Sequence, residues 1–304
     1  MTDVLVPGLP ATLVEAPLPA AAPAAARRTT PRRLGRFLVR RPGLVLSVVL
    51  VLLVVVAAFA PGLFTAQDPL VGEPADNFAA PGAAHWFGTD ELGRDVFSRV
   101  VHGAALSLKA TLVAVGVAFV VGGLLGLVAG FVGRWVEDLI MRVVDVLLSI
   151  PALFLSLALV TALGYGTVEV AVAVGVASVA GFARVMRAEV LRVRTAVYVE
   201  AARSSGVRWY GVLARHVLPN ALGPVLVLAT LELATAVLAV SSLSFLGYGA
   251  APPAPEWGNL ISAGRNYLGN AWWLTTLPGL VLAGTVLAIN RIARALDGEW
   301  AAAR

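Results

Sequence analysis

The chain has 304 residues, of which 59% are hydrophobic and only 13% are charged, whereas soluble domains contain about 25% charged residues. Its mean hydropathy of +0.84 is typical of a membrane protein, and the absence of cysteine excludes disulfides and thiolate chemistry. The net charge of +5 does not indicate nucleic-acid binding, because the arginines gather beside apolar segments, as they do in cytoplasmic loops of membrane proteins.

Residues 1–42 are predicted to form a flexible, basic cytoplasmic tail. Residues 1–26 are rich in Ala and Pro and offer no apolar face to bury. Seven arginines follow between positions 27 and 41, immediately before the apolar run Leu44 to Ala60. That run lacks the small-residue end of a cleaved signal peptide, so we interpret it as an uncleaved anchor with a cytoplasmic N-terminus.

Residues 43–300 are predicted to form one membrane domain, because six apolar stretches approach the roughly 20 residues that a spanning helix needs. Six spans place both termini in the cytoplasm and leave only four of the 23 basic residues outside: Arg94, Arg99, Lys109 and Arg265. The fold class is therefore an all-α membrane protein of the plasma membrane with six transmembrane helices. The predicted spans are Leu44 to Ala60, Leu106 to Val132, Val143 to Leu163, Val168 to Val185, Ala221 to Leu246 and Trp272 to Ile292.

The second and third spans carry residues that affect helix packing. Small residues allow helix backbones to approach closely in lipid, so the second span is predicted to be central; its glycines are Gly116, Gly122, Gly123, Gly126 and Gly130. Pro151 should kink the third span, either as a functional feature or as a consequence of packing. The outer segment Gly88 to Asp95 has the chemistry of a turn and a helix start, which indicates a structured cap or, alternatively, a contact surface for another protein.

Charged residues in the fifth predicted span and at the inner end of the third are candidates for a functional role. A carboxylate in a membrane segment is costly, so Glu232 in the fifth span is a candidate pore or gating residue, although a position near one end would allow it to be solvated or paired. Arg142 and Asp145 are three residues apart, which favours a local helix pair over a substrate site.

The stretch Arg184 to Asn220 is long, strongly basic and helical in its periodicity. It is predicted to form a helical hairpin at the inner face of the membrane, broken at Ser205-Gly206 and ended by Pro219. Charge alone would also fit a basic helix held to anionic headgroups.

The order of residues in this stretch is more specific than its charge. Glu200-Ala201-Ala202 is followed by Gly206 six residues after the acid, and by Leu218-Pro219. This pattern resembles the EAA loop of ABC-importer permeases. Small alanines permit close approach of another surface, and a glycine supplies a turn that a side chain would obstruct.

The resemblance extends from about Arg36 to the sixth span. His85 to Arg99, Ser244 to Gly247 and Trp257 to Asn259, together with Arg142, Asp145 and Pro151, resemble the C-type subunit of the dipeptide, oligopeptide and nickel permease family. One departure lies near the end of the chain, where Ile289 and Asn290 stand in place of an expected Gly and Asp, so the role of that segment stays open.

The resemblance implies a type I ABC importer (MetI-like) permease fold and a defined set of partners. These are a homologous B-type permease subunit, two cytoplasmic ABC ATPases, an extracytoplasmic solute-binding protein and the lipid bilayer. The implied substrate is a di- or oligopeptide, with glutathione-like peptides and nickel chelates open. The residues implied to couple to the ATPase are Glu200, Ala201, Ala202, Gly206, Leu218 and Pro219.

The sequence contains no phosphate-binding loop with which the chain could bind ATP itself. Such a loop requires the pattern GxxxxGK[ST], in which a glycine precedes the lysine. The one lysine of the chain, Lys109, follows Leu108 instead. The chain is thus predicted to be a non-enzymatic transport subunit with no cofactor of its own, while partner ATPases use ATP and Mg²⁺. The three histidines are scattered along the chain, so no shared metal site is expected. The alternative is a secondary transporter or channel that works alone.

Overall fold

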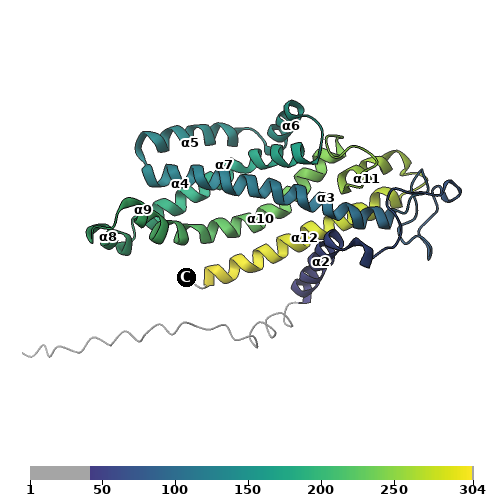
Figure 1. Ribbon diagram of the computed structural model, residues 1–304, viewed down its shortest axis with the longest axis horizontal. Helices are drawn as coiled ribbons and strands as arrows, with labels where there is room; N and C mark the ends of the chain where they lie inside the picture. Colours follow the sequence, from purple (N-terminus) through teal and green to yellow (C-terminus); the bar gives the residue numbers. More distant parts are fainter. Residues whose placement is uncertain (1–41, 303–304) are drawn as a thin grey trace, which may run out of the picture. The chain divides into compact units, whose positions relative to one another are not determined.

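The structure is a computed structural model that describes the backbone of residues 42–302 and the side chains of residues 42–297. The predicted cytoplasmic tail, apart from its last residue, lies outside the described residues. Within the described part of the chain, the regular elements are helices, and Thr89 and Asp95 form an isolated bridge (Figure 1). The helices are α2 (Pro42–Phe59), α3 (Val96–Val117), α4 (Gly123–Val132), α5 (Arg134–Ser149), α6 (Ala152–Leu163), α7 (Thr167–Arg194), α8 (Val197–Ser204), α9 (Trp209–Val212), α10 (Leu218–Phe245), α11 (Trp257–Gly264) and α12 (Trp273–Ala302).

Two pairs of these helices are continuous through a π-helical turn. Ala118–Gly122 joins α3 to α4, and Leu213–Val217 joins α9 to α10. Among the described residues, five helices are long and apolar enough to cross a membrane: Pro42–Phe59, Val96–Val132, Thr167–Arg194, Trp209–Phe245 and Trp273–Asp297. They cover five of the six predicted spans except for the end residues Ala60, Leu246 and Trp272, and several extend well beyond them.

The remaining predicted span is not a kinked helix but two helices, α5 and α6, bent by 97°. The chain leaves the helical conformation at Ile150, which is extended (φ −95°, ψ 126°), because the ring of Pro151 disfavours a helical residue before it. The predicted disturbance at Pro151 is therefore confirmed in its position, but the helix breaks there instead of continuing through a kink.

The bent pair nevertheless connects the two sides of the membrane domain. At its beginning, next to α4, the Arg194 guanidinium at the end of α7 donates to the Gly130 carbonyl at 2.7 Å. Just beyond α6, the Gly166 N–H donates to the carbonyl of Tyr248, which follows the other end of α10, at 2.9 Å. These contacts lie at opposite ends of α7. Helices α5 and α6 therefore cross the membrane domain together as one broken span, which is the third in chain order and brings the total to six.

Helix α7 lies at the centre of the fold, with α3, α4, α5, α6 and α10 packed around it. The predicted close packing of the second span is confirmed at Gly122, Gly126 and Gly130. A Cβ atom on Gly130 would lie 2.9 Å from the Val190 Cβ atom, and one on Gly126 would collide with the backbone of α7. Gly116 has open surroundings instead, so the prediction was wrong there.

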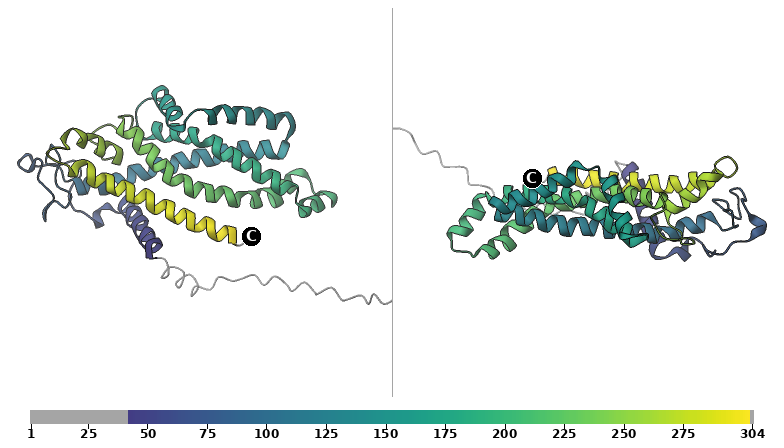
Figure 2. Two further views of the ribbon diagram at one scale, coloured as in Figure 1. Left: turned by 180° about the vertical axis from the view of Figure 1, so that it is seen from behind. Right: turned by 90° about the horizontal axis from the view of Figure 1, so that it is seen from above.

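The segment before α3 is a structured cap, as one of the two interpretations predicted. The Asp95 carboxylate accepts from the Ser98 N–H at 2.6 Å and caps α3. Asp90 holds the Arg94 guanidinium at 2.7 Å, and the Trp273 indole donates to the backbone of the same segment. Both views of Figure 2 place these loops beside α11 at one end of the helices.

The loop between α10 and α12 is fixed by a fully buried carboxylate. Glu256 precedes α11 and accepts from the Ser244 hydroxyl and the Ala250 N–H, each at 2.8 Å. Trp257, also buried, donates from its indole nitrogen to the Val100 carbonyl of α3 at 2.9 Å. These bonds offset the cost of burying the polar groups and join the outer ends of α3 and α10 to α11.

Candidate functional site

Helices α8 and α9 form a projecting segment between α7 and α10, at the end of the helices opposite to the α11 loops (Figure 1). The segment is anchored through three valines, Val199 of α8, Val212 of α9 and Val217 of the following π turn, which are all at most 1% exposed and belong to the same hydrophobic core as α7. Burial of such side chains contributes about 1.5–3 kcal/mol each. The segment is therefore held against the membrane domain on one side.

The turn between α8 and α9 is built on Gly206. Its φ angle is +79°, a conformation that costs other residues about 1–2 kcal/mol. The Gly206 N–H donates to the Arg203 carbonyl at 3.0 Å, and the Val207 N–H donates to the Ala202 carbonyl at 3.2 Å. These two bonds form a Schellman motif, which satisfies the last carbonyls of α8.

The predicted break at Ser205-Gly206 is thus confirmed, but the reason for the glycine differs from the expectation. Within the part of the chain that the structure describes, no neighbouring atom lies within 4 Å of a Cβ placed on Gly206, so a side chain would not be obstructed there. The backbone conformation, and not the available space, requires a glycine here.

The predicted start and end of the hairpin were wrong. Arg184 to Arg194 belong to α7, so the segment that leaves the membrane domain begins after Arg194. Pro219 does not end a helix but lies in the first turn of α10, within the continuous helix Trp209–Phe245. The π turn before it widens the helix, and the Leu218 N–H donates to the carbonyl of Leu213, five residues earlier. This widening relieves the clash that a proline ring makes with a preceding helical turn.

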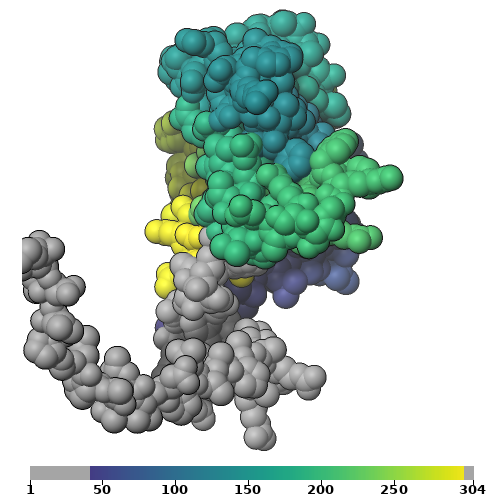
Figure 3. Space-filling model, turned by 90° about the vertical axis from the view of Figure 1, so that its left-hand side faces the viewer, coloured from purple at the N-terminus to yellow at the C-terminus, as the bar shows by residue number. Residues whose placement is uncertain are grey.

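The outward face of the segment is unusually apolar for a charged loop. Val197 is 82% exposed and Trp209 is 68% exposed, and Tyr198 and Tyr210 are exposed as well. Residues 203–210 are all exposed, including Arg203 and Arg208. Figure 3 faces this end and shows the residues around position 200, in green, on the surface. Aromatic and arginine side chains on a rigid element are typical of protein contact surfaces.

The structure brings four of the six predicted coupling residues together. Glu200 and Ala201 are exposed on α8, Ala202 is half-buried, and Gly206 forms the turn. Leu218 and Pro219 lie apart from these residues, at the base of α10, where Leu218 is half-buried and Pro219 exposed. A role for the aromatic residues of α9 was not predicted from the sequence, although two adjacent aromatic residues in a basic loop were a visible signal.

Comparison with known proteins decides the family. Residues 122–300 match the family described as "Binding-protein-dependent transport system inner membrane component". The chain belongs to this family. It is 39% identical to the dipeptide transport system permease protein DppC of Alkalihalophilus pseudofirmus, over 79% of this chain and 78% of that protein. It is 43% identical to the di/tripeptide transport system permease protein DppC of Pseudomonas aeruginosa, over 67% of each chain.

The solved structures agree on the fold. A structure of the MetNI methionine ABC transporter in inward facing conformations superposes with a TM-score of 0.50 and 23% identity, over 65% of this chain and 96% of that chain. The predicted membership and the MetI-like permease fold are thereby confirmed. The protein is a multi-pass permease of the bacterial plasma membrane and a transport component of an ABC importer.

The intramembrane carboxylate of this permease, Glu232, lies halfway along α10 and is half-buried. Fourteen residues separate it from Leu218 at the start of the helix, a distance of about 21 Å along the axis. Glu232 is therefore remote from both helix ends and from the α8–α9 segment. It makes no ion pair with the described side chains.

Asp145 of the permease pairs with another helix and not with Arg142. Its carboxylate accepts from the Arg184 guanidinium of α7 at 2.6 Å, so the predicted local pair was wrong. A second pair, Glu137 with Arg187, also joins α5 to α7, with the Arg187 Nε atom 2.7 Å from Glu137. Sequence spacing missed both pairs because the partners are 39 and 50 residues apart.

Proposed function

We propose that this permease forms half of a translocation pathway for peptides and that a homologous B-type permease forms the other half. Two cytoplasmic ABC ATPases would supply the energy from ATP and Mg²⁺, and an extracytoplasmic solute-binding protein would deliver the peptide. The names of the two relatives, which are dipeptide and di/tripeptide transport system permease proteins, support this substrate class. The chain itself would bind no cofactor, because all nucleotide chemistry would belong to the ATPases.

The observation that carries the coupling proposal is the two-sided construction of the α8–α9 segment. Val199 and Val212 fix it to the core, while Val197, Trp209 and Tyr210 present apolar surface away from it. A monomer gains nothing from exposing such residues at the cytoplasmic end, where water surrounds them. An ATPase groove that covers them would bury this surface on a segment that is already ordered.

Each predicted coupling residue has a distinct role in this proposal. The exposed carboxylate of Glu200 would accept charge-assisted hydrogen bonds from the ATPase, and the small side chain of Ala201 would allow close approach. Gly206 and the carbonyl of Ala202 would maintain the turn.

Leu218 and Pro219 would transmit the motion. They lie within the 37-residue helix Trp209–Phe245, which extends for about 55 Å. Because no loop interrupts this helix, a displacement of α9 by the ATPase would be carried along α10. Glu232, halfway along α10, would then move with it, and we propose it as a pore or gating residue that meets water when the pathway opens.

The test is a co-purification followed by reconstitution. The tagged chain is expressed with all reading frames adjacent to its own, and proteins that remain bound after detergent extraction are identified. We expect a second permease and ATPase subunits. A chain that assembles with no ATPase under these conditions would refute the importer proposal.

Reconstitution separates this function from a transporter that works alone. Liposomes with the whole assembly, ATP inside and binding protein outside should take up a radiolabelled dipeptide, and liposomes with this chain only should not, with or without an ion gradient. Uptake driven by an ion gradient in the second sample would instead identify a secondary transporter. Uptake of a radiolabelled nickel chelate, but not of the dipeptide, by the liposomes with the whole assembly would overturn the substrate class alone.

A further inference from the structure

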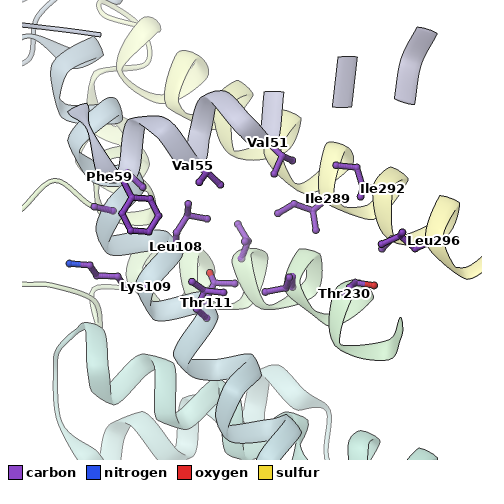
Figure 4. A pocket seen from close by; sticks show the side chains of 16 residues that line it. Val51, Val55, Phe59, Leu108, Lys109, Thr111, Thr230, Ile289, Ile292 and Leu296 are labelled. Carbon is purple, nitrogen blue, oxygen red and sulfur yellow. The ribbon is translucent and has the colours of Figure 1, made fainter. Parts of the chain in front are cut away.

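A cavity of about 590 Å³ lies among α2, α3, α10 and α12, away from the α8–α9 segment (Figure 4). Its lining is almost wholly apolar, with three polar side chains: Lys109, Thr111 and Thr230. The apolar side chains are Val51, Val55, Ala58, Phe59, Ala105, Leu108, Leu112, Leu233, Val237, Ile289, Ile292, Ala293 and Leu296. A space with such a lining does not retain water.

The cavity runs along the membrane and has a charge at one end. Figure 4 shows Lys109 and Phe59 at one end and Leu296 at the other. Phe59 is the last residue of α2, on the outer side, whereas Leu296 is near the cytoplasmic end of α12. Lys109 is the one lysine of the chain, it is exposed, and it makes no ion pair with the described side chains.

Two measures place Lys109 at the outer headgroup level. The inner end of α4 is Val132. A spanning helix of about 20 residues that ends there begins at position 113. Lys109 lies four residues farther out along the helix, which is about 6 Å. The 18 residues of α2 span about 27 Å and end at Phe59, which lines the same end of the cavity as Lys109. The ammonium group is therefore at the depth of lipid phosphates, while its alkyl stem lines the cavity.

The size of the cavity favours an extended chain as its occupant. An α-helix is about 10 Å in diameter, so one that crosses the membrane occupies roughly 2,000 Å³, which is more than the cavity offers. A lipid acyl chain is thin, apolar and abundant at this depth. The phosphate that accompanies it in an anionic lipid complements the unpaired charge of Lys109.

We propose that this cavity is a binding site for an anionic phospholipid of the outer leaflet, with one acyl chain between α2, α10 and α12 and the phosphate on Lys109. The lipid fills the space between α2 and the other helices and so contributes to the attachment of α2.

The experiment is native mass spectrometry of the full chain, purified in detergent with whatever subunits accompany it and titrated with phosphatidylglycerol or phosphatidylcholine. Lys109→Gln should weaken phosphatidylglycerol binding about fivefold, the effect of one basic residue near an anionic lipid, and weaken phosphatidylcholine binding less, because the choline cation offsets the charge of its phosphate. Lys109→Arg should restore the preference. Arg265→Gln, at another exposed outer residue, is the control and should have no effect.

A second pair of variants tests the acyl-chain site. Val55→Trp fills the cavity from its rim, where Val55 is 37% exposed, and should reduce the binding of both lipids. Leu52→Trp changes a lipid-facing residue of the same helix outside the cavity and should not. Equal effects of the two tryptophans, or an unchanged lipid preference in Lys109→Gln, would overturn the proposal.

A photo-crosslinking amino acid at position 55 identifies the occupant directly in the membrane. A mass increase of one phospholipid supports the site. Cross-linking to a second polypeptide would show that a partner subunit fills the cavity, and the proposal would be wrong.

Discussion

Replacing Gly206 by valine tests the turn between α8 and α9 without disturbing the core. The residue has a φ of +79° and no neighbour within 4 Å of a Cβ, so the substitution introduces backbone strain and no steric overlap. The strain is about 1–2 kcal/mol, and a β-branched side chain places it at the upper end of that range. Since 1–2 kcal/mol changes an equilibrium by a factor of about 5–30, the native turn should lose most of its population.

We expect ATP-dependent transport by the Gly206→Val permease to fall about five- to thirtyfold, because the backbone strain opposes the two hydrogen bonds that form the turn. The thermal midpoint of the membrane domain should stay within about 1 °C, since Val199 and Val212 remain buried. The assays are peptide uptake by the reconstituted assembly, stimulation of its ATPase activity by the binding protein, and a thermal-shift measurement on the same sample.

Two controls define the interpretation. Gly206→Asn should retain most activity, because asparagine tolerates this conformation better than other side chains do. Gly269→Val, at a glycine with open surroundings and no positive φ, should behave like the unmodified protein. Normal transport by Gly206→Val would show that the turn does not contact the ATPase and that the coupling surface has been misplaced.

Four further variants test the packing of the membrane domain by thermal unfolding in detergent. Gly126→Val should destabilise it by about 1–3 kcal/mol, because its side chain would overlap the backbone of α7, whereas Gly116→Ala, in open surroundings, should be neutral or stabilising; equal effects would contradict the packing. Glu137→Gln should cost about 1–2 kcal/mol by leaving the half-buried charge of Arg187 without its partner, and an unchanged midpoint would show that the pair contributes nothing. Trp257→Phe removes the buried N–H that donates to α3 and should cost about 1–3 kcal/mol, with hydrogen exchange at α11 rising above that at α7; unchanged exchange would argue against this role.

The sequence was sufficient for features that depend on neighbouring residues only. Apolar length and the distribution of arginines predicted the number of spans, because transfer into lipid is nearly additive along a helix. The break at Ser205-Gly206 followed from the conformational preference of glycine after a helix. The glycines of the second span likewise indicated close packing, although only the structure showed that Gly116 faces open space.

Features that depend on which helices meet could be decided only by the tertiary structure. Pro151 separates two helices bent by 97°, whereas Pro219 lies inside a continuous helix after a π turn, so the same residue type gave opposite outcomes. Asp145 binds Arg184 of α7 rather than its near neighbour Arg142, because helix packing brings that guanidinium closer. Lys109 was visible in the sequence as a solitary charge, but its place at the mouth of an apolar cavity results from the assembly of four helices. Local backbone preferences and transfer energies are encoded residue by residue, whereas long-range contacts arise only when separate spans pack together.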